Sequence, residues 1–119
     1  MPSWLFKTEP SDYSFEQLSK DGRTNWTGVK NALALIHLRK VRRGDEILIY
    51  HTGTVKSIVG IARAVTDAQG DSVEIAPVRA LRHPISLAEI RSNPRFKGFD
   101  LLRISRLAVL PVSKADKAQ

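Results

Sequence analysis

The chain contains no cysteine. Disulfide bonds, thiolate catalysis and sulfur-ligated metal sites are therefore excluded, and cysteine usage says nothing about the compartment. The N-terminus lacks a basic region followed by an apolar stretch. No run approaches the roughly 18 apolar residues that a membrane span needs. These absences predict a soluble, cytoplasmic protein that does not insert into a membrane.

Catalytic motifs are also missing. The three histidines, His37, His51 and His83, are scattered without a metal-ligand spacing such as HxH or HExxH. No GxSxG, GxGxxG or phosphate-binding glycine loop is present. In "YHT" at 50–52, neighbouring strand residues point to opposite faces, so His51 and Thr52 do not form a base–nucleophile pair. We therefore expect no enzyme, no metal and no cofactor.

Acidic residues are few relative to basic ones. The 119 residues include 19 Lys and Arg against 12 Asp and Glu, a net charge of +7. Such an excess attracts polyanions over a Debye length, about 8 to 10 Å at physiological salt. Nucleic acid is the first partner to expect and an anionic membrane surface the second. Solvated surface charge is the alternative that composition leaves open.

The apolar pattern predicts an α+β domain rich in strands. Alternating or continuous apolar stretches predict strands at 1–8, 46–51, 57–65, 72–81 and 106–112. Pro77 indicates an edge or a bulge in the fourth of these. Five or six strands with short helices between them suggest a small curved sheet or half-open barrel. The length fits a single domain, expected at 1–113, with a polar tail at 114–119.

Helix signals separate these strands. Capping boxes at Ser14–Gln17 and Ser86–Glu89 predict two short helices, the first ending near Gly22 and the second before Pro94. A longer helix is expected at 29–41 from its apolar stripe. Residues 23–28 between the first two helices are predicted to form a polar loop.

Only eight residues are aromatic, and both tryptophans lie in the first quarter of the chain. Stacking on a nucleic-acid base is worth about 1 to 3 kcal/mol. Trp4, on a strand face, is expected in the core, whereas Trp26 lies in a polar segment and is open to either role. Tyr50 is equally compatible with a core ring and a stacking surface. Basic side chains available for phosphate contacts are Lys30, Arg39, Arg42, Arg43 and Arg103, although cations at a helix C-terminus are also favoured by the helix dipole.

Six blocks of the sequence together resemble the EVE domain. They are "WLFKTEPSDYSFEQL", "WTGVKN", "LRKVRRGDEILIYHT", "IVGIARAV", "ALRHPISLAEIRSNP" and "LLRISRLAVLPVS", in that order. The EVE domain belongs to the PUA-like superfamily, beside the YTH and ASCH domains, and includes the thymocyte nuclear protein family. The resemblance covers Trp4 to Ser113 and is specific, because separated blocks agree in order.

The chain departs from the usual EVE pattern at four places. Leu35-Ile36 stands where the family has Arg-Asn, Lys30 replaces an arginine, and "YHT" replaces the commoner "YHS". Only residues 66–72 join two strands that a longer insertion usually separates. We interpret the short connection as a trimmed loop away from the pocket.

The resemblance implies a PUA-like pseudobarrel with a pocket for an extruded, modified base. The base would be a modified cytosine in DNA or, as in the YTH relatives, a methylated adenine in RNA. Trp26 is expected at the mouth of this pocket. The residues that the matching blocks carry over to the pocket are Lys7, Thr8, Trp26, Gly28, Val29, Asn31, Tyr50, His51, Thr52, Ser105, Arg106 and Leu107.

Two other functions remain open at this level. One is a small ASCH-like enzyme that processes nucleotides or nucleosides, in which Lys7, Glu9 or His51 would act as acid or base. The other is a general RNA-binding module without preference for modified bases. The choice between DNA and RNA, the modification and the oligomeric state are not encoded in any pattern that we recognise.

Overall fold

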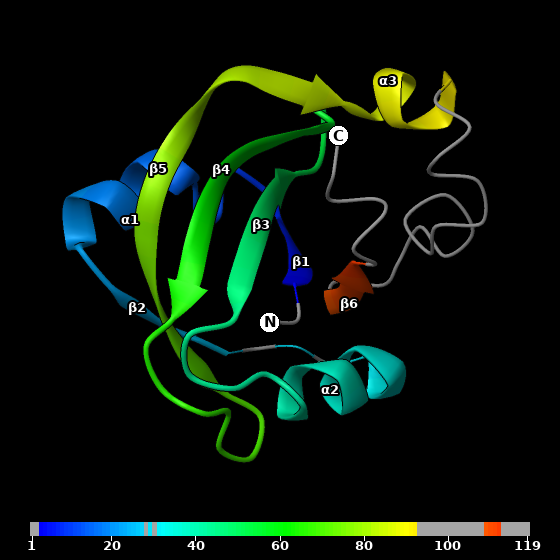
Figure 1. The fold of residues 1–119 in the computed structure, drawn as a ribbon. Coiled ribbons are helices and arrows are strands. Elements are labelled where there is room, and N and C mark those ends of the chain that lie inside the picture. The colour runs from blue at the N-terminus through cyan, green and yellow to red at the C-terminus, as the bar shows by residue number, and fades with distance from the viewer. Residues whose placement is uncertain (1–2, 28, 30, 93–108, 113–119) are drawn as a thin grey trace.

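The computed structural model describes residues 3–27, 29, 31–92 and 109–112. Its elements run through one mixed sheet with three short helices (Figure 1). In chain order they are β1 (Ser3–Thr8), α1 (Phe15–Asp21), β2 (Thr24–Trp26), α2 (Ala32–Arg39), β3 (Glu46–His51), β4 (Ser57–Ala64), β5 (Val73–Ser86), α3 (Leu87–Ser92) and β6 (Val109–Val112). No helix in these described ranges is both long and apolar enough to cross a membrane.

The sheet has the strand order β2-β5-β4-β3-β1-β6. Strands β1 and β3 are parallel, and all other neighbours are antiparallel. Its strands curve around a common interior, and α2 lies beside the end of the sheet where β3 begins (Figure 1). This is the α+β arrangement of a curved, half-open barrel that the strand pattern predicts.

The core lies on the inner face of the curved sheet. In the parallel register Phe6 faces Ile49, and Ile49 in turn faces Gly60 across the β3–β4 pair. A side chain at Gly60 would meet the ring of Phe15, because a Cβ built there would lie 2.5 Å from its Cε1. Gly60 therefore lets α1 seat Phe15 directly on the backbone of β4 and close the interior.

The ends of two helices follow their capping residues. The Ser14 hydroxyl accepts a hydrogen bond of 3.0 Å from the Gln17 N–H, and Gly22, with φ +80°, ends α1 as predicted. At α2, the Asn31 side chain accepts a hydrogen bond of 3.0 Å from the Ala34 N–H. Because Asn31 is the N-cap, α2 begins at Ala32 and not at 29 as the apolar stripe predicts.

Two further boundaries differ from the sequence-based prediction. The expected loop at 23–28 contains the strand β2, whose three residues pair with Val73–Ile75 of β5. Strand β5 continues to Ser86 instead of ending at 81, and it passes Pro77 by shifting register where Ile61 and Ala62 of β4 face it. The bulge predicted from Pro77 is thus present, but the strand continues beyond it. Residues 106–108 of the last predicted strand and the tail at 114–119 lie outside the described residues.

Candidate nucleic-acid interface

Two of the sequence blocks, "KTEP" and "YHT", meet at one edge of the sheet. In the parallel β1–β3 register Lys7 faces Tyr50 and Thr8 faces His51. The Thr52 N–H extends this contact by donating a hydrogen bond of 2.9 Å to the Thr8 carbonyl. Because β1 and β3 are parallel, their carboxyl ends share this edge. The fold therefore brings together residues that are more than forty positions apart.

The paired residues alternate between the two faces of the sheet. On the inner face, the Thr8 hydroxyl donates to the Tyr13 carbonyl at 2.8 Å, and His51 Nε2 accepts from the Phe15 N–H at 3.0 Å. Lys7 and Tyr50 lie one position earlier and so on the opposite face. Tyr50 is only 4 % exposed, which is the core role that the sequence left open for its ring. The register therefore places Thr8 and His51 on one face of the sheet and Lys7 and Tyr50 on the other.

His51 is held as a neutral ring. Burial lowers the pKa of its imidazole below the ordinary value of 6.5, while the nearby Glu9 carboxylate acts in the opposite direction. The lone pair on Nε2 is already used by the Phe15 N–H. A base at this position would have to break that hydrogen bond before it could accept a proton from a substrate. The geometry gives His51 a structural role at the start of α1.

Glu9 and Lys7 complete this edge. The Thr52 hydroxyl donates to Glu9 Oε2 at 3.4 Å, and a Cβ built on Gly53 would lie 2.7 Å from the same oxygen. Gly53 also has φ +74°, so a glycine suits both its backbone and the close approach of the carboxylate. Burial lowers the pKa of the Lys7 ammonium from its ordinary value. This edge of the sheet is therefore a tightly packed cluster of polar groups.

Trp26 lies nearby with its ring fixed by two aromatic neighbours. Its ring centre is 5.4 Å from that of Phe6, with planes tilted by 45°, and 6.2 Å from that of Tyr13 in an edge-on arrangement of 84°. Tyr13 is itself held by its hydroxyl, which donates to Asp21 Oδ2 at 2.7 Å. Trp26 is half-buried and packs against the core, so part of an ordered indole faces solvent. Tyr13 was not among the predicted site residues, although it stands within the "KTEPSDY" block.

The predicted phosphate contacts at the end of α2 lie elsewhere. Arg42 Nη1 donates to the carbonyls of Arg39 and Val41, at 2.8 and 3.0 Å, and Arg39 Nε donates to the Gly70 carbonyl at 3.2 Å. The two Arg42 bonds satisfy carbonyls at and just beyond the C-terminus of α2, as the dipole-based alternative expects, whereas the Arg39 bond joins α2 to the connection between β4 and β5. The cluster precedes β3, whose six residues span about 17 Å. It is therefore near the opposite end of the sheet from Thr8 and His51.

Comparison with known proteins identifies the family of the chain. The model of the EVE domain family matches residues 3–119. The chain belongs to the EVE domain family. The EVE domain also resembles the NMR structure of Rpa0253 from Rhodopseudomonas palustris, with 34 % identity, a TM-score of 0.92 and coverage of 99 % of this chain and 89 % of that one. No curated protein matches the chain.

More distant structures confirm the PUA-like fold. The human THYN1 protein in complex with 5-methylcytosine containing DNA has a TM-score of 0.92 at 24 % identity, over 99 % of this EVE domain and 94 % of that chain. An ASCH protein from Zymomonas mobilis has a TM-score of 0.61 at 12 % identity, over 98 % and 91 % of the two chains. At these identities the likeness concerns the fold alone.

Of the remaining predicted site residues of this EVE domain, three lie in the described part of the chain and six lie outside it. Val29 is half-buried against the core, and Asn31, the N-cap of α2, already uses its side-chain oxygen. The side chain of Arg43 is exposed, whereas its backbone N–H donates to Asp67 Oδ1 at 2.8 Å. The others lie outside the described residues: Gly28, Lys30, Arg103, Ser105, Arg106 and Leu107.

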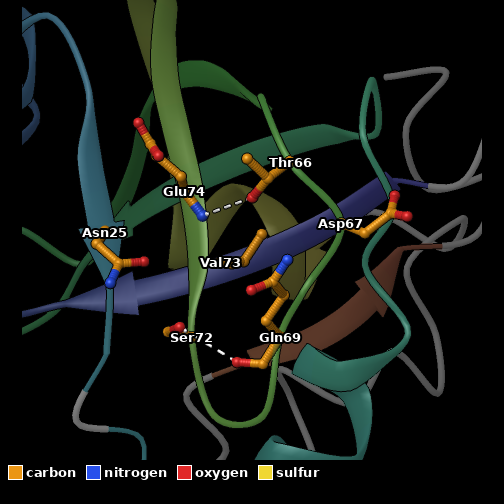
Figure 2. A pocket seen from close by; sticks show the side chains of 7 residues that line it. All are labelled: Asn25, Thr66, Asp67, Gln69, Ser72, Val73 and Glu74. Carbon is orange, nitrogen blue, oxygen red and sulfur yellow. Dashed lines mark hydrogen bonds between the residues drawn. The ribbon is translucent and has the colours of Figure 1, made fainter.

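A polar hollow of about 300 Å³ lies between β2 and the connection that follows β4 (Figure 2). Asn25, the neighbour of Trp26 in β2, forms one wall, and the turn that follows β4 forms the other. Its two carboxylates, on Asp67 and Glu74, disfavour an anionic ligand. The hollow thus contains none of the predicted site residues. It is lined by Asn25, Thr66, Asp67, Gln69, Ser72, Val73 and Glu74.

Proposed function

We propose that this EVE domain binds nucleic acid without catalysing a reaction, and that it accommodates a flipped, modified base on the exposed part of Trp26. The observation that carries the proposal is the half-buried indole, which is held by Phe6 and Tyr13 and keeps part of its surface toward solvent. An aromatic surface that is already ordered loses little conformational freedom when a base stacks on it. The net charge of +7 supplies attraction to any nucleic acid.

The energies are compatible with base flipping. Extruding a base costs a few kcal/mol, and stacking on an aromatic ring returns about 1 to 3 kcal/mol. Hydrogen bonds to the edge of the base supply the remainder. A methyl group adds only about 0.8 kcal/mol when it is buried, so methyl contact alone discriminates by several-fold. A strong preference would therefore require both a buried methyl group and polar contacts to the base edge.

Modified cytosine in DNA is the first ligand to test. The support comes from the human THYN1 protein, a structural neighbour that was solved with 5-methylcytosine containing DNA. Methylated adenine in RNA is the competing ligand, since the YTH relatives bind it. An enzymatic role finds less support, because His51, the strongest candidate for a base, has its Nε2 occupied by a backbone N–H.

Tryptophan fluorescence during titration with oligonucleotides tests the proposal. The oligonucleotides are matched DNA and RNA strands that carry 5-methylcytosine, 5-hydroxymethylcytosine, N6-methyladenine or no modification. We expect quenching at least tenfold tighter for one modified base, equivalent to about 1.4 kcal/mol. Trp26→Phe is the matched control, since it keeps a smaller aromatic face and should retain part of the preference. Because this variant lacks the reporting indole, its binding is followed by the anisotropy of a fluorescently labelled oligonucleotide, with the wild type measured in the same way.

Two outcomes would overturn the proposal. Equal, salt-sensitive affinity for all oligonucleotides would indicate a general nucleic-acid-binding module. Conversion of a modified nucleoside or nucleotide, followed by chromatography, would indicate the ASCH-like enzyme.

A further inference from the structure

Two segments that form part of the sheet contain no acidic residue. None of the chain's 12 Asp and Glu residues lies at 47–66 or at 75–88. These segments include most of β3, all of β4 and nearly all of β5. The cations that remain on β4 and β5 are Arg63, Arg79 and Arg82. Two carboxylates border this region: Glu74 lies near the start of β5 and pairs with Arg23, and Glu46 of β3 faces Arg63 in the strand register. Beyond them, positive charge dominates along the two strands.

The three arginines point away from the core. On β4 the inward positions around Arg63 are Ala62 and Ala64, both fully buried, so alternation places Arg63 on the outer face. Arg79 of β5 faces Ile61, the next outward residue of β4. Arg82 follows three positions later, within the register irregularity between Ile58 and Gly60 of β4, and it is exposed without an assigned face. In Figure 1, β5 runs beside β4 along the outer curve of the sheet.

No partner for these three side chains is found among the described residues. In the described part of the chain the two ion pairs join Lys20 to Glu16 and Arg23 to Glu74. Neither these pairs nor any hydrogen bond among the described residues engages the guanidinium of Arg63, Arg79 or Arg82. The arginines at the end of α2 differ, because Arg39 and Arg42 donate to backbone carbonyls. A free, planar guanidinium presents paired donors that match two phosphate oxygens.

We propose that Arg63, Arg79 and Arg82, the β4–β5 arginine strip, contact the phosphate backbone of the bound nucleic acid. This inference rests on the proposed function, because the same nucleic acid would place its modified base at Trp26. Strand β5 links the two sites: Val73 pairs with Trp26, and Arg79 lies six residues further on, about 20 Å along the strand. Duplex strands present a phosphate about every 3.4 Å, so this length covers roughly six phosphates.

The test compares two variants with the same net charge. The strip variant carries Arg63→Gln, Arg79→Gln and Arg82→Gln, and the control carries Lys20→Gln, Lys40→Gln and Lys117→Gln. Each lowers the net charge from +7 to +4. The affinity of an unmodified and a 5-methylcytosine DNA oligonucleotide is measured at several salt concentrations. A third variant with lysine at all three strip positions restores the charge.

We expect the strip variant to flatten the slope of log affinity against log salt by about 2 to 3, and to weaken binding about a hundredfold at 0.1 M salt. The control should change the slope by less than half as much, and the lysine variant should recover it. The ratio of affinities for modified and unmodified DNA should stay the same, because phosphate contacts do not read the base. Circular dichroism confirms that each variant folds.

The outcomes separate this inference from the proposed function. Equal losses in the strip and control variants would overturn the strip, because binding would then follow net charge. Loss of modified-base preference in the strip variant alone would also overturn it. Strip-dependent binding by a wild-type chain that shows no base preference would support the strip and reject the modified-base pocket. Binding of the wild-type chain to phosphatidylserine vesicles and not to DNA would reject both.

Discussion

The two tryptophans occupy opposite kinds of environment, although both precede the longest helix. Trp4 is 5 % exposed, and its Nε1–H donates a hydrogen bond of 3.0 Å to Asp45 Oδ2 in the interior. Trp26 is half-buried and contacts the rings of Phe6 and Tyr13, with no hydrogen bond from its indole N–H among the described residues. The Trp4 indole is buried in the core, whereas the Trp26 indole keeps part of its surface exposed to solvent.

The difference shows how a small domain uses one of its few large aromatic rings in the core and another at the surface. Asp45 is 1 % exposed and also accepts a hydrogen bond of 2.9 Å from the Arg42 N–H. Trp4 therefore ties β1 to the turn before β3 through a buried carboxylate with two donors. The Trp26 ring is ordered by its contacts with Phe6 and Tyr13 and by packing against the core, and part of its surface faces solvent. Only the second arrangement is suited to a ligand that arrives from solvent.

The largest effect should come from removing the buried ring. Trp4→Ala deletes a core indole and leaves the Asp45 carboxylate without one of its donors, so we expect a loss of about 3 to 5 kcal/mol in the free energy of unfolding. Urea denaturation followed by circular dichroism measures it. The folded fraction should keep its preference among oligonucleotides. A stable Trp4→Ala variant with lost preference would assign the ligand surface to Trp4.

Removing the acceptor should cost less. Asp45→Ala leaves the Trp4 Nε1–H and the Arg42 N–H without their shared carboxylate, and hydrogen bonds to a charged group are worth about 1.5 to 3 kcal/mol. We expect a destabilisation of about 2 to 3 kcal/mol in the same denaturation assay. Asp45→Asn keeps one acceptor oxygen and should lie between this variant and the wild type. Equal stability of Asp45→Ala and the wild type would show that the ring is held by packing alone.

Truncating the half-buried Trp26 ring should have a smaller effect on stability and a larger effect on binding. Trp26→Ala removes packing against Phe6 and Tyr13, so we expect a loss of about 1 to 2 kcal/mol, below the range for fully buried tryptophan. Preference for a modified base should disappear. Unfolding and oligonucleotide titration on the same preparation check both. Retained preference together with a loss above 3 kcal/mol would place Trp26 with Trp4 in the core.

The sequence predicts the frame of this molecule better than its surfaces. Strand β1, the helix that Ser14 caps and the strands at 46–51 and 57–65 are found close to their predicted bounds, because periodicity and capping are local signals. Strand β2 is not visible locally, since its three residues are strand only through pairing with Val73–Ile75. The N-cap role of Asn31 could have been predicted from the sequence, because asparagine before an apolar helical run is a preferred N-cap.

Site residues are harder to predict, since they depend on which face each side chain takes. The register that separates Lys7 and Tyr50 from Thr8 and His51 is a property of the β1–β3 pair and not of either segment. The arginine strip has a sequence signal, the absence of acidic residues from 47–66 and 75–88. That signal gains meaning only when β4 and β5 are known to be neighbours with a common outer face.

The smallest expected effect is a dependence of the Trp26 side of the molecule on pH. Because burial lowers the pKa of His51 in the folded state, the unfolded chain binds the proton more readily. The stability contributed by neutral His51 is therefore complete above the ordinary value of 6.5 and is lost as the pH falls below it. Protonation also breaks the hydrogen bond from the Phe15 N–H, worth about 1 kcal/mol, next to Tyr13 that packs on Trp26.

The measurement is unfolding at pH 7.5 and pH 5.5 for the wild type and for His51→Gln, whose side chain can still accept a hydrogen bond. The wild type should lose up to about 1 kcal/mol more than the variant between these two pH values. His37 lies 6.3 Å from Trp4, so His37→Gln serves as the matched control for the buried side. If His37→Gln, and not His51→Gln, removed the acid sensitivity, the labile region would be the Trp4 side, and the contrast between the two tryptophans would be reversed.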